Sequence, residues 1–308
     1  MKIPKIHDVV DRGQKEYFKW QYLRSTKAVL DTPPIQPGTL PFTTLSMVHK
    51  RDVISYLVAL KSFARYCNPQ RVVIVCDPTI DQGDQAVFKH HIPHVQLISA
   101  SESTHPDIPR GGCWERLYAI TNIVHDTYVV QLDADTVTAM PIPEVVSAIE
   151  SGSGFVLGEE PDQTLLPLGV TCSNAQSRLI SRPHIQTYSE VAIAHVDLPQ
   201  DALYVRGCAG FTGFPKQNGM KDRLLDFSTK MSAKLPGRWS NWGTEQVASN
   251  YLVANSVNTS VLPFPKYGTP DVDKGQSSFV HFIGSMRFIN NKYRDLSMKI
   301  HKEMLSLV

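Results

Sequence analysis

The stretch 128–135 reads Tyr-Val-Val-Gln-Leu-Asp-Ala-Asp, an apolar run that ends in two carboxylates separated by one residue. A continuous apolar run of this kind is typical of a strand buried on both faces of a sheet. Two carboxylates about 4 Å apart repel by about 4 kcal/mol at an effective dielectric of about 20. Because a hard divalent cation removes this repulsion, we expect Asp133 and Asp135 to bind Mn²⁺ or Mg²⁺ at the end of the strand.

The sequence before this run alternates between strand and helix patterns. The predicted fold class is α/β, with a mainly parallel central sheet and helices on both faces. In such sheets ligands bind beyond the carboxyl ends of the strands, so Asp77 should face the same crevice as Asp133 and Asp135. We expect strands at 39–48, 71–76, 94–99 and 127–132, and helices at 51–66, 82–90 and 112–125.

The flanking parts of the chain are less regular. A helix is expected over 8–30, and the proline-rich segment 31–38 ends it because proline removes backbone donors. Residues 159–201 are rich in Pro, Ser, Thr and Gln and should form long loops with short helices, as an irregular lobe. Further strands are expected at 204–214 and 278–283, and further helices at 216–233, 243–254 and 291–307.

Composition excludes several functional classes. The chain has 308 residues, a formal net charge of +2 and no long basic run, so nucleic acid is not an expected partner. No stretch has the length and hydrophobicity of a secretory signal or a membrane span. The five cysteines are scattered and indicate neither a zinc site nor a disulfide framework. We therefore expect a cytoplasmic protein, whose oligomeric state the sequence does not indicate.

A second motif lies near the end of the chain, in Phe-Val-His-Phe-Ile-Gly at 279–284. The imidazole of His281 can complete a metal shell that has two carboxylates, because Mn²⁺ accepts both oxygen and nitrogen ligands. The amide of Gly284 can approach a phosphate oxygen, and Arg287 can neutralise a diphosphate. The alternative for His281 is a packed or solvated side chain without a metal.

A third motif is Arg-Trp-Ser-Asn-Trp-Gly-Thr-Glu-Gln at 238–246. Trp239 and Trp242 could stack on the apolar faces of an acceptor sugar, while Glu245 and Gln246 could bind its hydroxyl groups. The alternative is a capped helix whose tryptophans pack in the core.

These motifs resemble those of the retaining glycosyltransferases of family eight, the group that contains glycogenin and bacterial galactosyltransferases. Residues 113–136 are similar to the family's helix and metal-binding strand, and 207–214 to its small-residue strand below the donor sugar. The segment His281-Phe282-Ile283-Gly284-x-x-Arg287 is similar to its C-terminal His-Phe-x-Gly-x-x-Lys-Pro-Trp signature, with arginine in place of lysine and Phe-Ile in place of Pro-Trp.

The resemblance covers roughly residues 39–290 and implies a GT-A type fold, that of nucleotide-diphospho-sugar transferases. On this basis 1–38 is an N-terminal helical extension with a proline-rich linker, and 39–290 is the glycosyltransferase domain. Within that domain 39–140 is the nucleotide-binding half and 141–290 the acceptor half. Residues 291–308 are a C-terminal helix.

The resemblance also implies a donor site. Met47 and Val48 would enclose the base, and Asp77 would contact base or ribose unless it is only a turn residue before Pro78. Arg116 would bind donor phosphate or sugar unless it is only an exposed cation. The complete expected donor set is Met47, Val48, Asp77, Arg116, Asp133, Ala134, Asp135, Gly284 and Arg287, with Mn²⁺ or Mg²⁺ held by Asp133, Asp135 and His281.

The implied reaction moves a hexose from a nucleoside diphosphate sugar, a UDP sugar first, to a hydroxyl of a glycan, protein or small molecule, with retention. Glu245, Gln246 and Arg287 are the expected catalytic residues. One alternative is a haloacid-dehalogenase-like phosphatase with Asp133 as nucleophile and Asp135 as general acid, because 130–137 fits the opening motif of that class. The other is an inactive sugar-nucleotide-binding relative.

Overall fold

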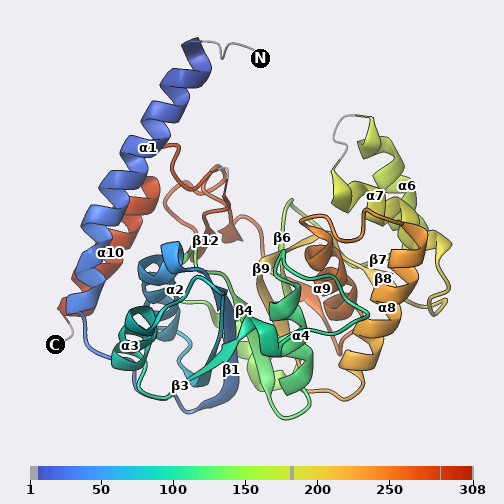
Figure 1. Ribbon diagram of the computed structural model, residues 1–308, viewed down its shortest axis with the longest axis horizontal. Coiled ribbons are helices and arrows are strands. Elements are labelled where there is room, and N and C mark those ends of the chain that lie inside the picture. Colours follow the sequence, from blue (N-terminus) through green and yellow to red (C-terminus); the bar gives the residue numbers. More distant parts are fainter. Residues whose placement is uncertain (1–5, 181–183, 285, 307–308) are drawn as a thin grey trace.

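The computed structural model describes residues 6–180, 184–284 and 286–306, with side chains from residue 12 onward. Its centre is a seven-stranded sheet (Figure 1). The strands lie in the order β10 (Ser260–Val261), β6 (Phe155–Gly158), β9 (Gly207–Phe214), β4 (Tyr128–Leu132), β1 (Leu40–Val48), β2 (Pro69–Cys76) and β3 (Val95–Ser99).

Most of the sheet is parallel, as predicted. Strands β1 to β4 run in the same direction, while β9 is antiparallel to its neighbours β4 and β6. The predicted fold class is therefore confirmed. Because β4 lies in the middle of the sheet, its carboxyl end opens between the two halves of the molecule.

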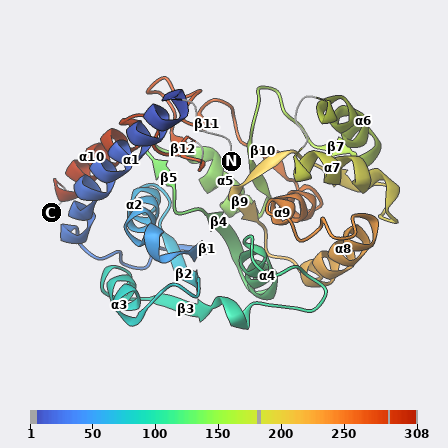
Figure 2. The ribbon, with the colours of Figure 1, turned by 45° about the horizontal axis from the view of Figure 1, so that its top comes forward.

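Helices cover both faces of the sheet (Figure 2). Successive side chains of a strand point to opposite faces, and in β2 Val72 and Ile74 belong to one hydrophobic cluster whereas Val73 and Val75 belong to the other. This burial explains the continuous apolar runs of the sequence. The first face carries α2 (Val53–Ala64), α3 (Gln82–His91) and α5 (Pro143–Ser151), and the second carries α4 (Trp114–Ile123), α8 (Met220–Lys234) and α9 (Thr244–Ala254).

A small second sheet continues the chain beyond β4. It consists of β11 (Tyr267–Gly268), β12 (Phe279–His281) and β5 (Thr136–Thr138). Strand β12 is antiparallel to β5, with His281 opposite Thr136. This register connects the end of the chain to the segment that follows β4.

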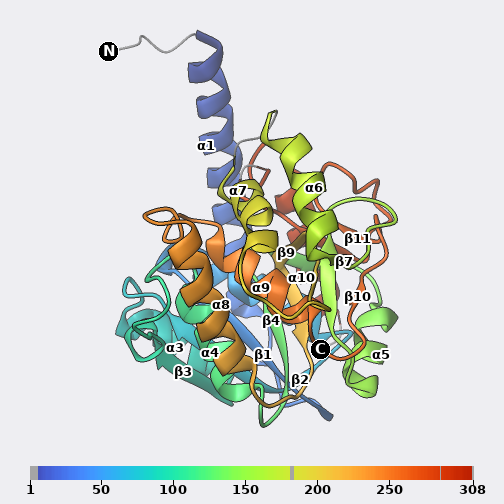
Figure 3. The ribbon, with the colours of Figure 1, turned by 90° about the vertical axis from the view of Figure 1, so that its right-hand side faces the viewer.

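Residues 159–180 and 184–206 form a lobe at the opposite end of the molecule from α3 (Figure 1), here named the α6–α7 lobe, and Figure 3 views the molecule from the side of this lobe. Its elements are β7 (Leu166–Pro167), α6 (Leu168–Leu179), α7 (Ile185–Ala192), the 3₁₀ turn η4 (Ile193–His195) and β8 (Leu203–Tyr204). The sequence predicts long loops and short helices here, and the structure adds the pairing of β7 with β8.

The two terminal helices lie side by side at the other end of the molecule (Figures 1 and 2). In α1 (Ile6–Thr26) the ring of Tyr22 stacks on that of Tyr293 in α10 (Lys292–Leu305), with ring centroids 4.1 Å apart. Residues 1–5 of the expected extension and 307–308 of the expected C-terminal helix lie outside the described residues. The division into three parts remains a prediction. Further 3₁₀ turns are η1 (Lys27–Asp31), η2 (Lys50–Asp52) and η3 (Ala100–Glu102).

None of the described helices has the length and hydrophobicity that crossing a bilayer requires.

Candidate active site

Three segments that are distant in sequence meet where β4 ends. The amide of Asp133 donates to the carbonyl of Gly210 in β9 (2.9 Å), and the amide of Phe282 after β12 donates to the carbonyl of Asp135 (2.8 Å). Together with the β5–β12 register, these bonds place His281 beside the two carboxylates. The backbone therefore fixes the arrangement before any side-chain contact is considered.

The side chains of Asp133, Asp135 and His281 form a compact cluster. One possible ligand atom from each lies within 4.8 Å of the other two. The Nε2 atom of His281 is 3.2 Å from Oδ1 of Asp135 and 3.8 Å from Oδ2 of Asp133. Carboxylate oxygens with one imidazole nitrogen are a donor set that suits Mn²⁺, and Mg²⁺ shares the preference for the oxygens. The structure thus brings together the three residues predicted as metal ligands.

Arg116 in α4 holds Asp133 from one side. One terminal nitrogen donates to Asp133, and the other donates to both oxygens of Glu245, at 3.1 and 3.2 Å. The Arg116 side chain is 5% exposed, so this ion pair is largely shielded from solvent. The alternative of an exposed cation for Arg116 is therefore wrong.

Arg287 holds Asp135 from the other side. Its guanidinium donates to Asp135 and, over 2.7 Å, to Oδ1 of Asp52 in η2. The two arginines thus face four carboxylates in total. When all four carboxylates are ionised they outnumber the guanidiniums, and a divalent cation would reduce this excess of negative charge.

The pKa values of the cluster reflect this crowding. Burial by itself would raise the pKa of Asp135, but His281 and Arg287 outweigh it and hold the pKa well below its usual range. Burial favours the neutral ring of His281, yet the adjoining Cys208 and Asp135 raise its pKa well above the usual value. A bound cation would compete with a proton for the imidazole nitrogen.

Glu245 has a different environment. Burial raises its pKa to about 7, although Arg116 acts in the opposite direction. A carboxyl group with this pKa can hold or release a proton near neutral pH. Gly243, with a positive φ of 103°, immediately precedes α9 and allows the turn that brings Glu245 into the site.

The cluster lines a cavity of about 300 Å³. Of the predicted residues, Arg116, Asp133, Asp135, Trp242, Glu245, Gln246, His281 and Gly284 all lie in its wall. Trp242 is 75% exposed, so its indole is accessible to a ligand. The side chain of Gln246 accepts a hydrogen bond from the amide of Ala209 (3.4 Å) and donates to Gln186 (3.1 Å).

Strand β9 forms the floor beneath His281. A Cβ atom at Gly210 would lie 2.1 Å from Cε1 of His281, so only glycine leaves room for the imidazole. The Sγ atom of Cys208 lies 3.2 Å from Nδ1 of the same ring. The expected small-residue strand therefore has a direct steric function.

Other predicted donor residues lie outside the wall of this cavity. Met47 and Val48 end β1, and Ala134 is buried with its carbonyl 3.5 Å from the Tyr293 hydroxyl. Asp77 accepts a hydrogen bond from the amide of Thr79 (2.9 Å), which is the turn role that the sequence left open. Whether these residues contact a donor stays a prediction.

Arg287 lines a neighbouring cavity of about 470 Å³, in whose wall Gly284 also takes part. Gly284 therefore borders both cavities.

Trp239 also lies elsewhere. It is 2% exposed, its indole nitrogen donates to the hydroxyl of Ser228 (3.0 Å), and its ring lies 5.5 Å from that of Trp114. This is the core packing that the sequence analysis gave as the alternative, and it leaves Trp242 as the accessible aromatic residue of the pair.

Sequence reasoning missed Asp52 and Cys208. Asp52 follows the carboxyl end of β1, so the same rule that selected Asp77 could have selected it. Cys208 carries no signal of its own in the sequence, because its contact with His281 arises from the packing of β9 against β12.

No protein-family model and no curated protein matches the sequence. Solved structures do match. An active-site mutant of LgtC superimposes with a TM-score of 0.50 at 9% identity, over 86% of this chain and 96% of that chain. Another LgtC structure, described as a galactosyltransferase with donor and acceptor sugar analogs, gives 0.42 at 10% identity, over 87% and 96%. Mouse xyloside xylosyltransferase 1 gives 0.46 at 12% identity, over 80% of this chain and 98% of that chain.

Identities this low establish the fold alone. The likeness to LgtC agrees with the family-eight resemblance of the motifs. The chain has the GT-A fold of glycosyltransferases.

Proposed function

We propose that the chain is a metal-dependent glycosyltransferase that moves a hexose from a nucleoside diphosphate sugar, with UDP as the first candidate nucleotide, to a hydroxyl acceptor with retention. The observation that carries the proposal is the Asp133–Asp135–His281 cluster at the carboxyl end of the central strand, in the wall of a cavity. These three residues would hold Mn²⁺ or Mg²⁺. When bound, the cation would supply Lewis-acid stabilisation to the diphosphate.

The residues around the cluster suit a leaving group that gains negative charge. Arg287 is held between Asp52 and Asp135, so its guanidinium would be oriented before the diphosphate departs. Gly284 lines the same cavity as the cluster, and its amide would donate to a phosphate oxygen. Both groups would stabilise charge that develops during the reaction.

Glu245 and Gln246 would contact the sugars. The pKa of Glu245 of about 7 lets its carboxyl group either donate to or accept from a sugar hydroxyl near neutral pH. Trp242 would stack on the apolar face of the acceptor, because its indole is exposed beside the cavity. Arg116 would orient Asp133 and Glu245 together.

The phosphatase alternative finds little support in the geometry. Its expected nucleophile, Asp133, is ion-paired with Arg116. Among the described residues that line the cavity, none is the lysine that such an enzyme needs to neutralise a phosphoryl group.

The test is incubation of the purified chain with UDP, GDP, ADP and dTDP sugars in the presence of Mn²⁺, Mg²⁺ or a chelator. Release of a nucleoside diphosphate from one donor, lost in the chelator, supports the proposal, and NMR of the product anomer tests retention. Aryl-phosphate hydrolysis that survives His281→Ala would indicate the phosphatase. Tight binding of a nucleotide sugar without turnover would indicate an inactive relative.

A further inference from the structure

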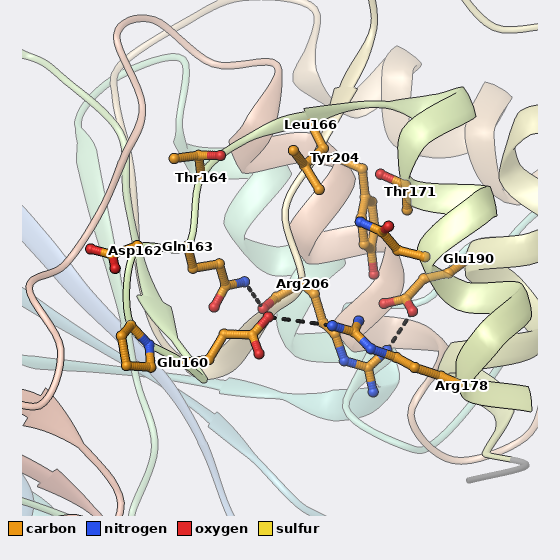
Figure 4. A pocket seen from close by; sticks show the side chains of 12 residues that line it. Glu160, Asp162, Gln163, Thr164, Leu166, Thr171, Arg178, Glu190, Tyr204 and Arg206 are labelled. Carbon is orange, nitrogen blue, oxygen red and sulfur yellow. Dashed lines mark hydrogen bonds and ion pairs between the residues drawn. The ribbon is translucent and has the colours of Figure 1, made fainter. Parts of the chain in front are cut away.

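A further cavity lies within the α6–α7 lobe, apart from the cluster (Figure 4). Its volume is about 200 Å³, and its walls come from the loop between β6 and β7, from α6, from α7 and from the end of β8. Figure 4 shows the side chains of Gln163, Thr171, Glu190, Tyr204 and Arg206 around this space. None of these residues takes part in the proposed reaction.

Two buried polar atoms in the wall of this cavity lack partners among the described residues. The side chain of Glu190 is 1% exposed; its Oε2 accepts from Arg206, whereas its Oε1 has no partner. Thr171, 6% exposed, has an unpartnered Oγ1. An unsatisfied buried polar atom destabilises the folded chain, so a ligand that hydrogen-bonds to both atoms would remove this penalty.

The charge balance of the cavity selects a class of ligand. Arg206 pairs with Glu190 and with Glu159 (3.3 Å), and Arg178 pairs with Glu160 (3.3 Å). Both guanidiniums already have carboxylate partners, and Asp162 adds a further carboxylate to the wall, so the cavity disfavours a phosphate or carboxylate ligand. A neutral molecule with several hydroxyl groups fits an acceptor-rich cavity of this kind, because each hydroxyl can both donate and accept.

This cavity adjoins the candidate active site. Glu159 lines the active-site cavity and forms the ion pair with Arg206, which lines the lobe cavity. The amide of Glu159 also donates to Gln163 (2.8 Å), which lines the lobe cavity. Glu159 therefore links the walls of the two cavities.

We propose that the lobe cavity is a second saccharide-binding site, which binds a neutral sugar unit of the acceptor through Glu190 and Thr171 while another unit presents its hydroxyl at the cluster. Its role as an acceptor subsite rests on the proposed function; its ligand class rests on the cavity itself.

The test uses the full chain and binding calorimetry with lactose, cellobiose, mannobiose, chitobiose and maltotriose, and with glucose 6-phosphate as the anionic probe. Asn174→Trp fills the exposed rim of the cavity on α6, and Thr171→Val removes the unpartnered hydroxyl while keeping its shape. Ser173→Trp is the matched control, because Ser173 is exposed on the same helix outside the cavity wall.

At least one neutral saccharide should bind the unmodified chain. Its affinity for Asn174→Trp and for Thr171→Val should be about tenfold or more lower, and its affinity for Ser173→Trp should be unchanged. Three results would overturn the inference: no binding of any neutral saccharide, equal binding to both cavity variants, or preference for glucose 6-phosphate.

A separate readout isolates the proposed function. Metal-dependent donor hydrolysis without acceptor should be the same in Asn174→Trp as in the unmodified chain. Suppose that the unmodified chain binds a saccharide but does not turn over any donor, and that Asn174→Trp no longer binds the saccharide. The saccharide site is then supported and the proposed function is contradicted. If donor turnover is present and saccharide binding is absent, the reverse holds.

Discussion

The active-site cavity and the lobe cavity are built from similar residues but differ in how their carboxyl groups are arranged and paired. Around the cluster, four carboxyl groups face two guanidiniums and one imidazole, and possible ligand atoms of Asp133, Asp135 and His281 lie within 4.8 Å of one another. In the lobe, each arginine has carboxylate partners, and the unsatisfied groups are single oxygen atoms of Glu190 and Thr171. The arrangement at the cluster suits a cation, and the arrangement in the lobe suits a ligand with hydroxyl groups.

The two cavities also differ in what holds them. Backbone hydrogen bonds from β9 and β12 position the cluster, so its geometry depends on the sheet. In the lobe cavity the short pairing of β7 with β8 holds Leu166 opposite Tyr204, and side-chain pairs such as Arg206 with Glu190 join the other walls. Substitutions at the cluster should therefore change metal binding and catalysis, whereas those in the lobe should change acceptor binding alone.

The largest effect is expected for Asp135→Asn. Loss of this charge removes a metal ligand and the partner of both His281 and Arg287, so metal-dependent turnover should fall roughly 1000-fold, about 4 kcal/mol. Steady-state kinetics at saturating Mn²⁺ measures this loss of turnover, and Asp126→Asn, at an exposed position, is the control. If the turnover of Asp135→Asn stays within about threefold of that of the unmodified chain, the cluster does not take part in the reaction.

Glu245→Gln should change how stability depends on pH. Because the folded-state pKa of Glu245 is raised from 4.5 to about 7, its stabilising contribution is present below pH 4.5 and is lost as the pH rises through 7. Relative to the variant, the unmodified chain should lose on the order of 3 kcal/mol of unfolding free energy across this window. Chemical denaturation at several pH values measures the difference, with the exposed Glu150→Gln as control. Parallel stability curves for the chain and Glu245→Gln would show that folding does not raise the pKa of Glu245.

Gly210→Ala should weaken metal binding without removing a ligand. The added Cβ would lie 2.1 Å from Cε1 of His281, so the imidazole must move, and Mn²⁺ affinity should fall roughly 10- to 100-fold. Gly13→Ala is the control, because a Cβ there meets nothing within 4 Å. Unchanged affinity in Gly210→Ala would mean that the imidazole is not fixed by β9.

The smallest effect is expected for Asp52→Ala. Its carboxylate orients Arg287, so the variant should lower kcat/KM for the donor about tenfold while Mn²⁺ affinity without nucleotide stays unchanged. Asp107→Ala, at an exposed position, is the control. An equal loss of Mn²⁺ affinity would instead place Asp52 in direct support of the metal ligands.

The part of the site that the sequence predicts well is the part that depends on the sheet. The apolar run 128–132 identifies the central strand, and topology then places Asp133 and Asp135 at its open end. The approach of His281 to these carboxylates is expected from the resemblance of the motif at 281–287 to the family-eight signature. These features depend on local pattern and on a few rules of sheet architecture.

The remainder depends on packing that no local pattern encodes. Trp239 and Trp242 are separated by only two residues, yet one is buried against Trp114 and the other is exposed. The segment 159–201 has no clear periodicity, so the sequence predicts irregular structure there but does not predict the cavity between its helices. The pairing of Asp52 with Arg287 joins residues from opposite ends of the chain.

The most direct test of the central claim is a titration of Mn²⁺ into the chain and into His281→Ala, followed by electron paramagnetic resonance with and without UDP. The account predicts that the unmodified chain binds Mn²⁺ more tightly when UDP is present, and that His281→Ala loses most of this affinity. Equal Mn²⁺ affinity in the two proteins, with UDP making no difference, would contradict it.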